Sequence, residues 1–212
     1  MDSRLRAAAA LRDLNHAFVA HDRDDDGLLD LATMCDAEAA AMRSGPRRDR
    51  LALMQRAREA AGQVIPTAAD DRPVSGFEDR AVAGRANPTS IDLDVRFDDG
   101  EVVADVLLRP AFEGAPGRAH GGIVAAAFDD ITGFVIGMLQ EPAFTGELTV
   151  RFVRPVPVEE RLVIRSRLVS RERRKLFITA EAVAADGGVV ATCRATYITV
   201  DPALFAGAPD PR

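Results

Sequence analysis

The chain has 212 residues, of which 47% are hydrophobic and 28% charged, and this balance is typical of a folded globular domain. A formal net charge of −6 argues against nucleic-acid binding, because such binding needs a basic face that displaces counterions from phosphates. The two cysteines, Cys35 and Cys193, are far apart and predict neither a disulfide framework nor a zinc site. Charges interrupt the opening segment MDSRLRAAAALRDL, so we expect no signal peptide and a cytoplasmic location.

The first third of the chain is predicted to be helical. Apolar residues recur at helical spacing over residues 5–18, and two further helical runs follow at about 28–43 and 48–62. Residues 66–90 carry three prolines among charged residues, which predicts an irregular linker. We therefore expect a helical N-terminal extension over residues 1–65, followed by that linker.

Residues 22–33 read DRDDDGLLDLAT and match the first nine positions of a calcium-binding EF-hand loop. Position twelve of the loop is Thr33, where a bidentate glutamate is expected, and no second loop accompanies it. We favour an acidic connection between two helices, with acids near the start of the second helix, where the helix dipole stabilises them. The three histidines lack metal-ligand spacing, so no metal site is predicted.

After the linker the hydrophobic pattern changes from helical spacing to strict alternation. Apolar residues alternate with charged ones over 91–97, which predicts a half-buried strand, and 101–108 reads as its hairpin partner. A glycine-rich loop and a long apolar helix come next. Four more strands are then predicted, at 146–153, 161–170, 175–184 and 189–200. We expect one α+β domain over residues 91–202 and a frayed tail over 203–212.

The long helix, Gly121–Leu139, is apolar around nearly its whole circumference, so it must be buried. A membrane span is the alternative to a protein core. Two adjacent acids near the centre, Asp129 and Asp130, would each cost about 2.5–3.5 kcal/mol in a bilayer, and no second span accompanies the helix. We therefore predict a core helix wrapped by an antiparallel sheet, and no membrane span.

The two acids cannot share one environment, because consecutive helical residues point about 100° apart. An ionised, unpaired carboxylate is unfavourable in apolar surroundings, and burial raises its pKa. One acid is therefore expected to pair structurally at the edge of an interface, which leaves the other free for chemistry. For Asp130 the residues leave both interpretations open.

The start of this helix suits an anion. Gly121 and Gly122 let a ligand approach the backbone, and the free N–H groups of the first turn lie at the positive end of the helix dipole. An oxyanion that develops during a reaction would be stabilised there. Asp129 lies about 10–12 Å further along the axis, so the glycines and the acid can serve one reaction only if they come from different subunits.

The segments FEGAPGRAHGGIVAAAFDDITG, TGELTVRFVRPVPV and RERRKLF follow one another in this chain. In them the chain resembles the hotdog-fold acyl-CoA thioesterases, specifically the PaaI-like branch and its mitochondrial thioesterase-superfamily relatives. A His-Gly-Gly motif with an acid nine positions after the histidine carries the resemblance, which covers about residues 85–202. It implies a hotdog fold, in which an antiparallel sheet wraps a long central helix. It also implies hydrolysis of an acyl-CoA to a free carboxylic acid and coenzyme A.

The family's functional positions carry over onto matching residues of this sequence. The resemblance implies that Asp129 is the catalytic carboxylate, acting as general base or as nucleophile. It implies that the Gly121 N–H polarises the thioester carbonyl, with His120 beside it. Thr145 matches a polar residue near the catalytic water, and we expect it to act from the facing subunit. The residues expected to contact coenzyme A are Gly122, Arg151, Val153, Arg174 and Lys175.

The resemblance implies no cofactor, because the coenzyme A thioester is itself the substrate. The expected assembly is a homodimer with active sites at its interface, and tetramers or hexamers remain open. A hotdog module that binds acyl-CoA without hydrolysing it, as a sensor or carrier, is the alternative. The intact His-Gly-Gly motif and Asp129 count against that alternative. The long helical extension departs from the minimal family pattern, and it could cover the acyl tunnel or mediate assembly.

Overall fold

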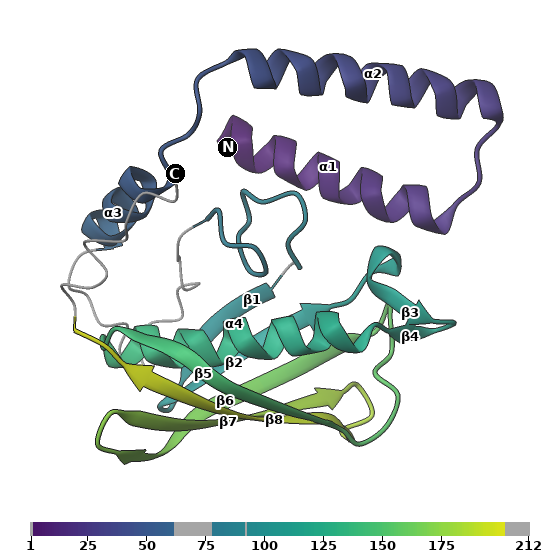
Figure 1. Cartoon of the computed structure of the whole chain (residues 1–212). Helices are drawn as coiled ribbons and strands as arrows, with labels where there is room; N and C mark the ends of the chain where they lie inside the picture. The colour runs from purple at the N-terminus through teal and green to yellow at the C-terminus, as the bar shows by residue number, and fades with distance from the viewer. Residues whose placement is uncertain (1, 62–77, 92, 202–212) are drawn as a thin grey trace.

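The computed structural model describes residues 2–61, 78–91 and 93–201. The N-terminal part forms three helices, which are α1 (Ser3–Ala20), α2 (Asp25–Ser44) and α3 (Arg50–Ala61). The rest is an antiparallel sheet curved around one long helix, α4 (Gly121–Leu139), as Figure 1 shows. This is the predicted hotdog architecture with a helical extension. The expected tail, 203–212, and residues 66–77 of the expected linker lie outside the described residues.

The main sheet has six strands in the spatial order β1-β2-β6-β7-β8-β5, and every neighbouring pair is antiparallel. The strands are β1 (Leu93–Asp98), β2 (Glu101–Leu107), β5 (Ala143–Phe152), β6 (Arg161–Glu172), β7 (Lys175–Ala184) and β8 (Val189–Thr199). Apolar residues alternate with polar ones along β6 and β7, so one face of the sheet is buried against α4 and the other meets solvent.

α4 is the centre of the core. Eight of its residues are buried, and Phe128 and Ile131 are fully enclosed. They pack against side chains of β2, β5, β6, β7 and β8, and each such large side chain contributes about 1.5–3 kcal/mol through burial. Among the described residues α4 is the one helix long and apolar enough to cross a membrane. In the structure, the sheet packs against its buried residues.

Strand boundaries follow the sequence closely except at β5 and in the loop before α4. β5 begins at Ala143 instead of at residue 146, because a β-bulge between Thr145 and Glu147 lets pairing with β8 continue. The glycine-rich loop is more ordered than predicted. It contains a 3-10 turn, η1 (Pro110–Phe112), and a hairpin of β3 (Glu113–Ala115) and β4 (Arg118–Ala119).

α1 docks on the hotdog domain through a polar stripe instead of an apolar one. Its buried residues are Ala8, Arg12 and His16, which are spaced four apart on one face. Leu14 and Phe18, on the side facing α2, remain 37% and 58% exposed. The apolar spacing predicted the helix correctly. The buried face, however, is the polar one, because Arg12 and His16 can form hydrogen bonds there.

The acidic segment 22–33 joins α1 to α2 and starts the second helix. Asp24 is the N-cap of α2, and its Oδ1 accepts a hydrogen bond from Gly27 N at 2.9 Å. Asp25 and Asp26 occupy the first turn, where the helix dipole stabilises them. This agrees with the interpretation as a helix connection. Within residues 2–61, 78–91 and 93–201, no three His, Cys, Asp or Glu side chains converge as a metal site.

Asp79, in the segment before β1, ties parts of the extension together. Its carboxylate pairs with both terminal nitrogens of Arg48 at 2.7 Å, and Arg4 Nε lies 3.7 Å away. Its backbone carbonyl accepts a hydrogen bond from Arg50 Nη2 at 2.9 Å. The hydrogen bond from Arg48 is the main cause that lowers the pKa of Asp79. Asp79, whose side chain is mostly buried, therefore connects α1, α3 and the segment between α2 and α3.

We expect Asp79→Asn to destabilise the protein by about 1–3 kcal/mol at neutral pH, because the arginines lose their carboxylate partner. The pKa of Asp79 is lower in the fold than its usual 3.8, so this contribution is complete above the unfolded value and is lost as the pH falls through the folded value. Urea unfolding at pH 7 and in steps down to pH ~3 measures the difference between wild type and variant.

The difference should shrink as the wild-type carboxyl group becomes protonated. Asp94→Asn, at an exposed position of β1, is the matched control and should stay close to wild type. A stability difference that is constant across this pH range contradicts the assignment to the Asp79 charge.

Candidate active site

The side chains of Asp129 and Asp130, in the middle of α4, lie in two different environments, as the helical geometry predicted. Asp129 meets β5, through Thr145. Asp130 instead meets the segment 78–91, through Arg80 and Ala83. The two adjacent acids therefore have different neighbours and different physical roles.

Asp129 is held by a residue of its own chain. Its Oδ1 accepts a hydrogen bond from Thr145 Oγ1 at 2.9 Å, next to the bulge in β5. The expectation that Thr145 acts from the facing subunit concerns a second chain and stays a prediction. Asp129 is half-buried and Thr145 exposed, so water has access to the carboxylate. A fixed carboxylate with unused lone pairs can accept a proton from such a water.

Two hydroxyl groups that sequence reasoning missed brace the backbone at Asp129. Tyr197 Oη donates a hydrogen bond to the Asp129 carbonyl at 3.0 Å and lies 2.9 Å from Thr132 Oγ1. Both side chains are buried, and burial raises the pKa of Tyr197, so the phenol remains a proton donor. The available signal was compositional, because Tyr197 is the chain's single tyrosine and stands in an apolar strand.

Cys193 lies on β8 near the same acid and is unreactive there. Burial raises the pKa of Cys193 to about 12, and the negative charge of Asp129 is a second, smaller cause. The thiol therefore stays protonated at neutral pH and supplies no thiolate nucleophile. Cys35, on α2, is exposed.

Asp130 fastens the segment before β1 to α4. Burial raises its pKa, while the charge of Arg80 and the backbone hydrogen bond from Ala83 lower it. The Arg80 guanidinium lies over the Phe134 ring at 3.9 Å from the centroid, a cation–π contact within the same cluster. Of the two interpretations that the residues left open, this geometry favours structural pairing for Asp130.

The N-terminal end of α4 borders a surface cleft of about 390 Å³ that β3, β4 and the segment after β5 also line. His120 caps the helix, because its Nδ1 accepts a hydrogen bond from Gly122 N at 3.0 Å. Within the described part of the chain, no acceptor takes the Gly121 N–H. A Cβ at position 121 would lie 3.1 Å from the Phe152 ring. This end thus combines a free backbone donor with an aromatic wall.

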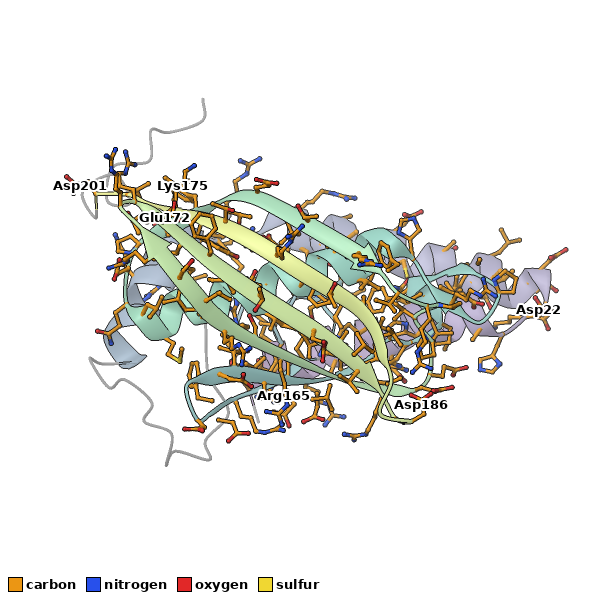
Figure 2. All side chains as sticks on the ribbon, turned by 90° about the horizontal axis from the view of Figure 1, so that it is seen from below. Asp22, Arg165, Glu172, Lys175, Asp186 and Asp201 are labelled. Carbon is orange, nitrogen blue, oxygen red and sulfur yellow. The ribbon has the colours of Figure 1, made fainter. Side chains whose placement is uncertain are left out.

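The other predicted coenzyme A contacts are split between the two ends of the sheet. Arg151 lies on β5, and Val153 is the first residue after this strand. Both lie at the end of the sheet near Gly121, where the neighbouring Arg154 pairs with Asp186. Figure 2 shows Asp186 at one end of the sheet and Lys175 at the other.

Arg174 lies in the turn between β6 and β7, and its Nε donates a hydrogen bond to the Thr199 carbonyl at 3.0 Å. Lys175 follows as the first residue of β7. Lys175 aligns across β8 with Phe144, which is seven residues from Arg151, or about 23 Å along an extended strand. One chain therefore does not bring the two basic groups together.

Comparison with known proteins finds a family match within the hotdog domain. Residues 116–191 match the family model described as Thioesterase superfamily, and the match includes both Gly121 and Asp129. The acyl-coenzyme A thioesterase THEM4 of Mus musculus is 32% identical over 91 residues, which are 42% of this chain and 39% of that protein. THEM4 of Bos taurus is 33% identical over 94 residues, 44% of this chain and 38% of that protein. The chain thus spans about two fifths of the length of these curated relatives.

A solved structure shares the fold over nearly the whole chain. The thioesterase superfamily protein RHA08564 superimposes with a TM-score of 0.73 at 24% identity, covering 93% of this chain and 95% of that one. Such coverage exceeds the share of the chain in the hotdog domain, so the likeness includes the helical extension. The hotdog domain of this chain thus contains the stretch, residues 116–191, that matches the Thioesterase superfamily model, and the chain has the fold of a solved thioesterase superfamily protein. The resemblance that the His-Gly-Gly and Asp129 pattern indicated is confirmed.

The difference between the two cysteines gives a direct test of the site's chemistry. In the folded protein at pH 7 to 8, a thiol-alkylating reagent is expected to modify Cys35 and to leave Cys193 intact, because the Cys193 thiol is buried and its pKa is about 12. Peptide mass mapping after a short reaction measures both. Denaturant should make the two sites react alike, and rapid labelling of Cys193 in the native protein would contradict the burial.

Proposed function

We propose that this chain is an acyl-CoA thioesterase. The observation that carries the proposal is a solvent-accessible carboxylate, Asp129, on a largely apolar core helix, fixed by Thr145 at 2.9 Å. A charge in such a position is unfavourable unless it has a task, since burial penalises the ionised form. The superfamily of the domain and the names of its curated relatives support thioester hydrolysis as that task.

In the proposed reaction Asp129 takes a proton from water, and the oxygen of that water attacks the thioester carbonyl carbon. The carbonyl oxygen becomes an oxyanion, which the Gly121 N–H stabilises at the positive end of α4. The C–S bond then breaks, and coenzyme A leaves as the thiolate and takes up a proton. Direct attack by the carboxylate is the other route to the same products. A thioester is already an activated acyl donor, so the scheme needs no cofactor.

We propose that the active sites lie at the interface of a homodimer. Gly121 and Asp129 are eight residues apart on one helix, about 12 Å, which is too far to flank one carbonyl group. Within the described residues β5 has a strand neighbour on one side only, and its Phe144 and Phe152 are 55% and 50% exposed. Such an edge is a template for pairing with a second copy. Antiparallel pairing of two β5 strands would bring the Gly121 end of one chain toward the Asp129 of the other.

The first test is release of coenzyme A from a panel of acyl-CoAs, from short to long aliphatic chains plus phenylacetyl-CoA. Asp129→Asn keeps the size of the side chain and removes the base, so kcat is expected to fall by about a hundredfold or more. Asp94→Asn makes the same chemical change at an exposed position of β1 and should keep wild-type activity.

Tight binding of acyl-CoA without release, in wild type as well as variant, would favour the sensor or carrier instead. Equal activity in wild type and Asp129→Asn would show that another group is the base.

A second test isolates the Gly121 N–H and the dimer together. Gly121→Pro removes this N–H at a helix position where proline is tolerated, and His120 already has φ −64° and ψ 129°, a conformation allowed before proline. Gly121→Ala is the control, because its Cβ meets the Phe152 ring in the same way and keeps the N–H. We expect a loss of kcat in Gly121→Pro well beyond that in Gly121→Ala.

Mixing inactive Gly121→Pro with inactive Asp129→Asn should then restore activity. In a mixed dimer one interface site carries both changes and the other carries neither, so random exchange restores about a quarter of the wild-type rate. A mixture that stays inactive after verified subunit exchange would mean that both residues act within one chain.

A further inference from the structure

α1 contacts the segment that leads into α4. Figure 1 shows it lying over η1, the turn that leads through β3 and β4 into α4, and α1 and η1 are in contact. The buried stripe of α1 is polar, so directional hydrogen bonds determine the position of the helix on the hotdog domain. Hydrogen bonds hold a helix in one defined position, whereas apolar contacts alone would allow it to shift.

Arg12 and His16 make these contacts. Arg12 Nη1 donates to the backbone carbonyls of Arg85 at 3.0 Å and Asn87 at 2.8 Å. His16 Nδ1 accepts a hydrogen bond from the Ala111 N–H at 3.1 Å. The first N–H groups of a short helical turn have no partner within the turn, so His16 serves as a cap for η1 supplied from a distant part of the chain.

η1 connects α1 to the start of α4 through side-chain and backbone contacts. The His16 ring meets the Phe112 ring edge-on, with centroids 4.9 Å apart, and the Phe112 carbonyl accepts a hydrogen bond from His120 N at 2.8 Å. Gly114 runs so close to His120 that a Cβ at position 114 would lie 2.8 Å from its Cα. His120 is in turn the cap that engages Gly122 N and leaves the Gly121 N–H free. Contacts therefore run without a break from α1 to the free donor.

We propose that α1 is a positioning element of the active site, in which His16, through η1, holds His120 so that the Gly121 N–H faces the thioester oxygen. The inference rests on the proposed function for the role of Gly121. Catalytic donors must be held within about 0.5 Å of the productive geometry, and a misplacement of about 1 Å can cost a hundredfold in rate. His16 touches no reacting atom in this scheme, so it is a positioning residue.

The kinetic test compares two substitutions at one position. His16→Ala removes the acceptor of the Ala111 N–H, whereas His16→Asn places an oxygen acceptor close to the position of Nδ1. Leu14→Ala, on the half-exposed side of α1, is the matched control. With rates normalised to folded protein, we expect kcat of His16→Ala to fall by about tenfold to a hundredfold while KM changes little. His16→Asn should recover most of that loss, and Leu14→Ala should behave as wild type.

Amide hydrogen exchange tests the same coupling without any substrate. In His16→Ala we expect the amides of Ala111, His120 and Gly122 to exchange about tenfold faster than in wild type, because their hydrogen bonds form one connected series. The amide of Ile178, in the middle of β7, should be unchanged. If the wild-type protein hydrolyses no acyl-CoA, the proposed function fails, and the exchange rates still decide whether α1 controls the start of α4.

Three results would overturn the inference. Faster exchange at Ala111 alone would mean that the contact ends at η1. Faster exchange at Ile178 to the same degree would mean a general loss of stability. In an active enzyme, an unchanged kcat of His16→Ala would mean that the Gly121 N–H keeps its place without α1.

Discussion

The enclosure of α4 by the sheet is the constraint on which the rest of the molecule depends. A helix that is apolar on nearly every side requires a cover, and the antiparallel strands supply it with their buried face. The first turn of the helix and the carboxylate of Asp129 lie outside this cover. Both are polar, both lie where the sheet leaves the helix open, and both are the groups to which thioester chemistry is assigned. The packing of α4 against the sheet thus limits the positions on the helix at which chemistry can occur.

Asp129 and Asp130 show how a single step along a helix separates two tasks. The turn of about 100° sends one carboxylate toward β5 and the other toward Arg80. The first meets a hydroxyl donor and solvent, whereas the second meets a buried guanidinium and a backbone N–H. Asp130 and Arg80 help hold the segment before β1 on α4, which gives the adjacent acid a firm base. Support and reactivity therefore come from neighbouring positions without sharing an environment.

The sequence predicted the elements whose signals are local. The bounds of α4 and β7 were predicted correctly, because a fully apolar run and an alternating strand leave little choice of conformation. The hydrogen bond between Thr145 and the carboxylate of Asp129 needed the structure, because it depends on the bulge in β5 and on how β5 runs along α4. Tyr197 was missed for a similar reason, since its contact with the Asp129 carbonyl joins residues far apart in the chain. The polar seat of α1 also depends on such long-range contacts, which periodicity does not encode.

The attachment of α1 has a consequence for how this protein can vary. Arg12 recognises the carbonyl oxygens of residues 85 and 87, which every amino acid carries, and not their side chains. The side chain at position 85 can therefore change in evolution or be replaced by engineering while the helix stays attached. At position 87 the side chain has its own role, because the Asn87 Oδ1 accepts hydrogen bonds from the N–H and the hydroxyl of Thr89. What the attachment cannot tolerate is a change of chain length or backbone direction there, because either would turn the two acceptors away. Insertions and deletions at this site, more than substitutions, should mark the proteins in which this helix has taken up a different role.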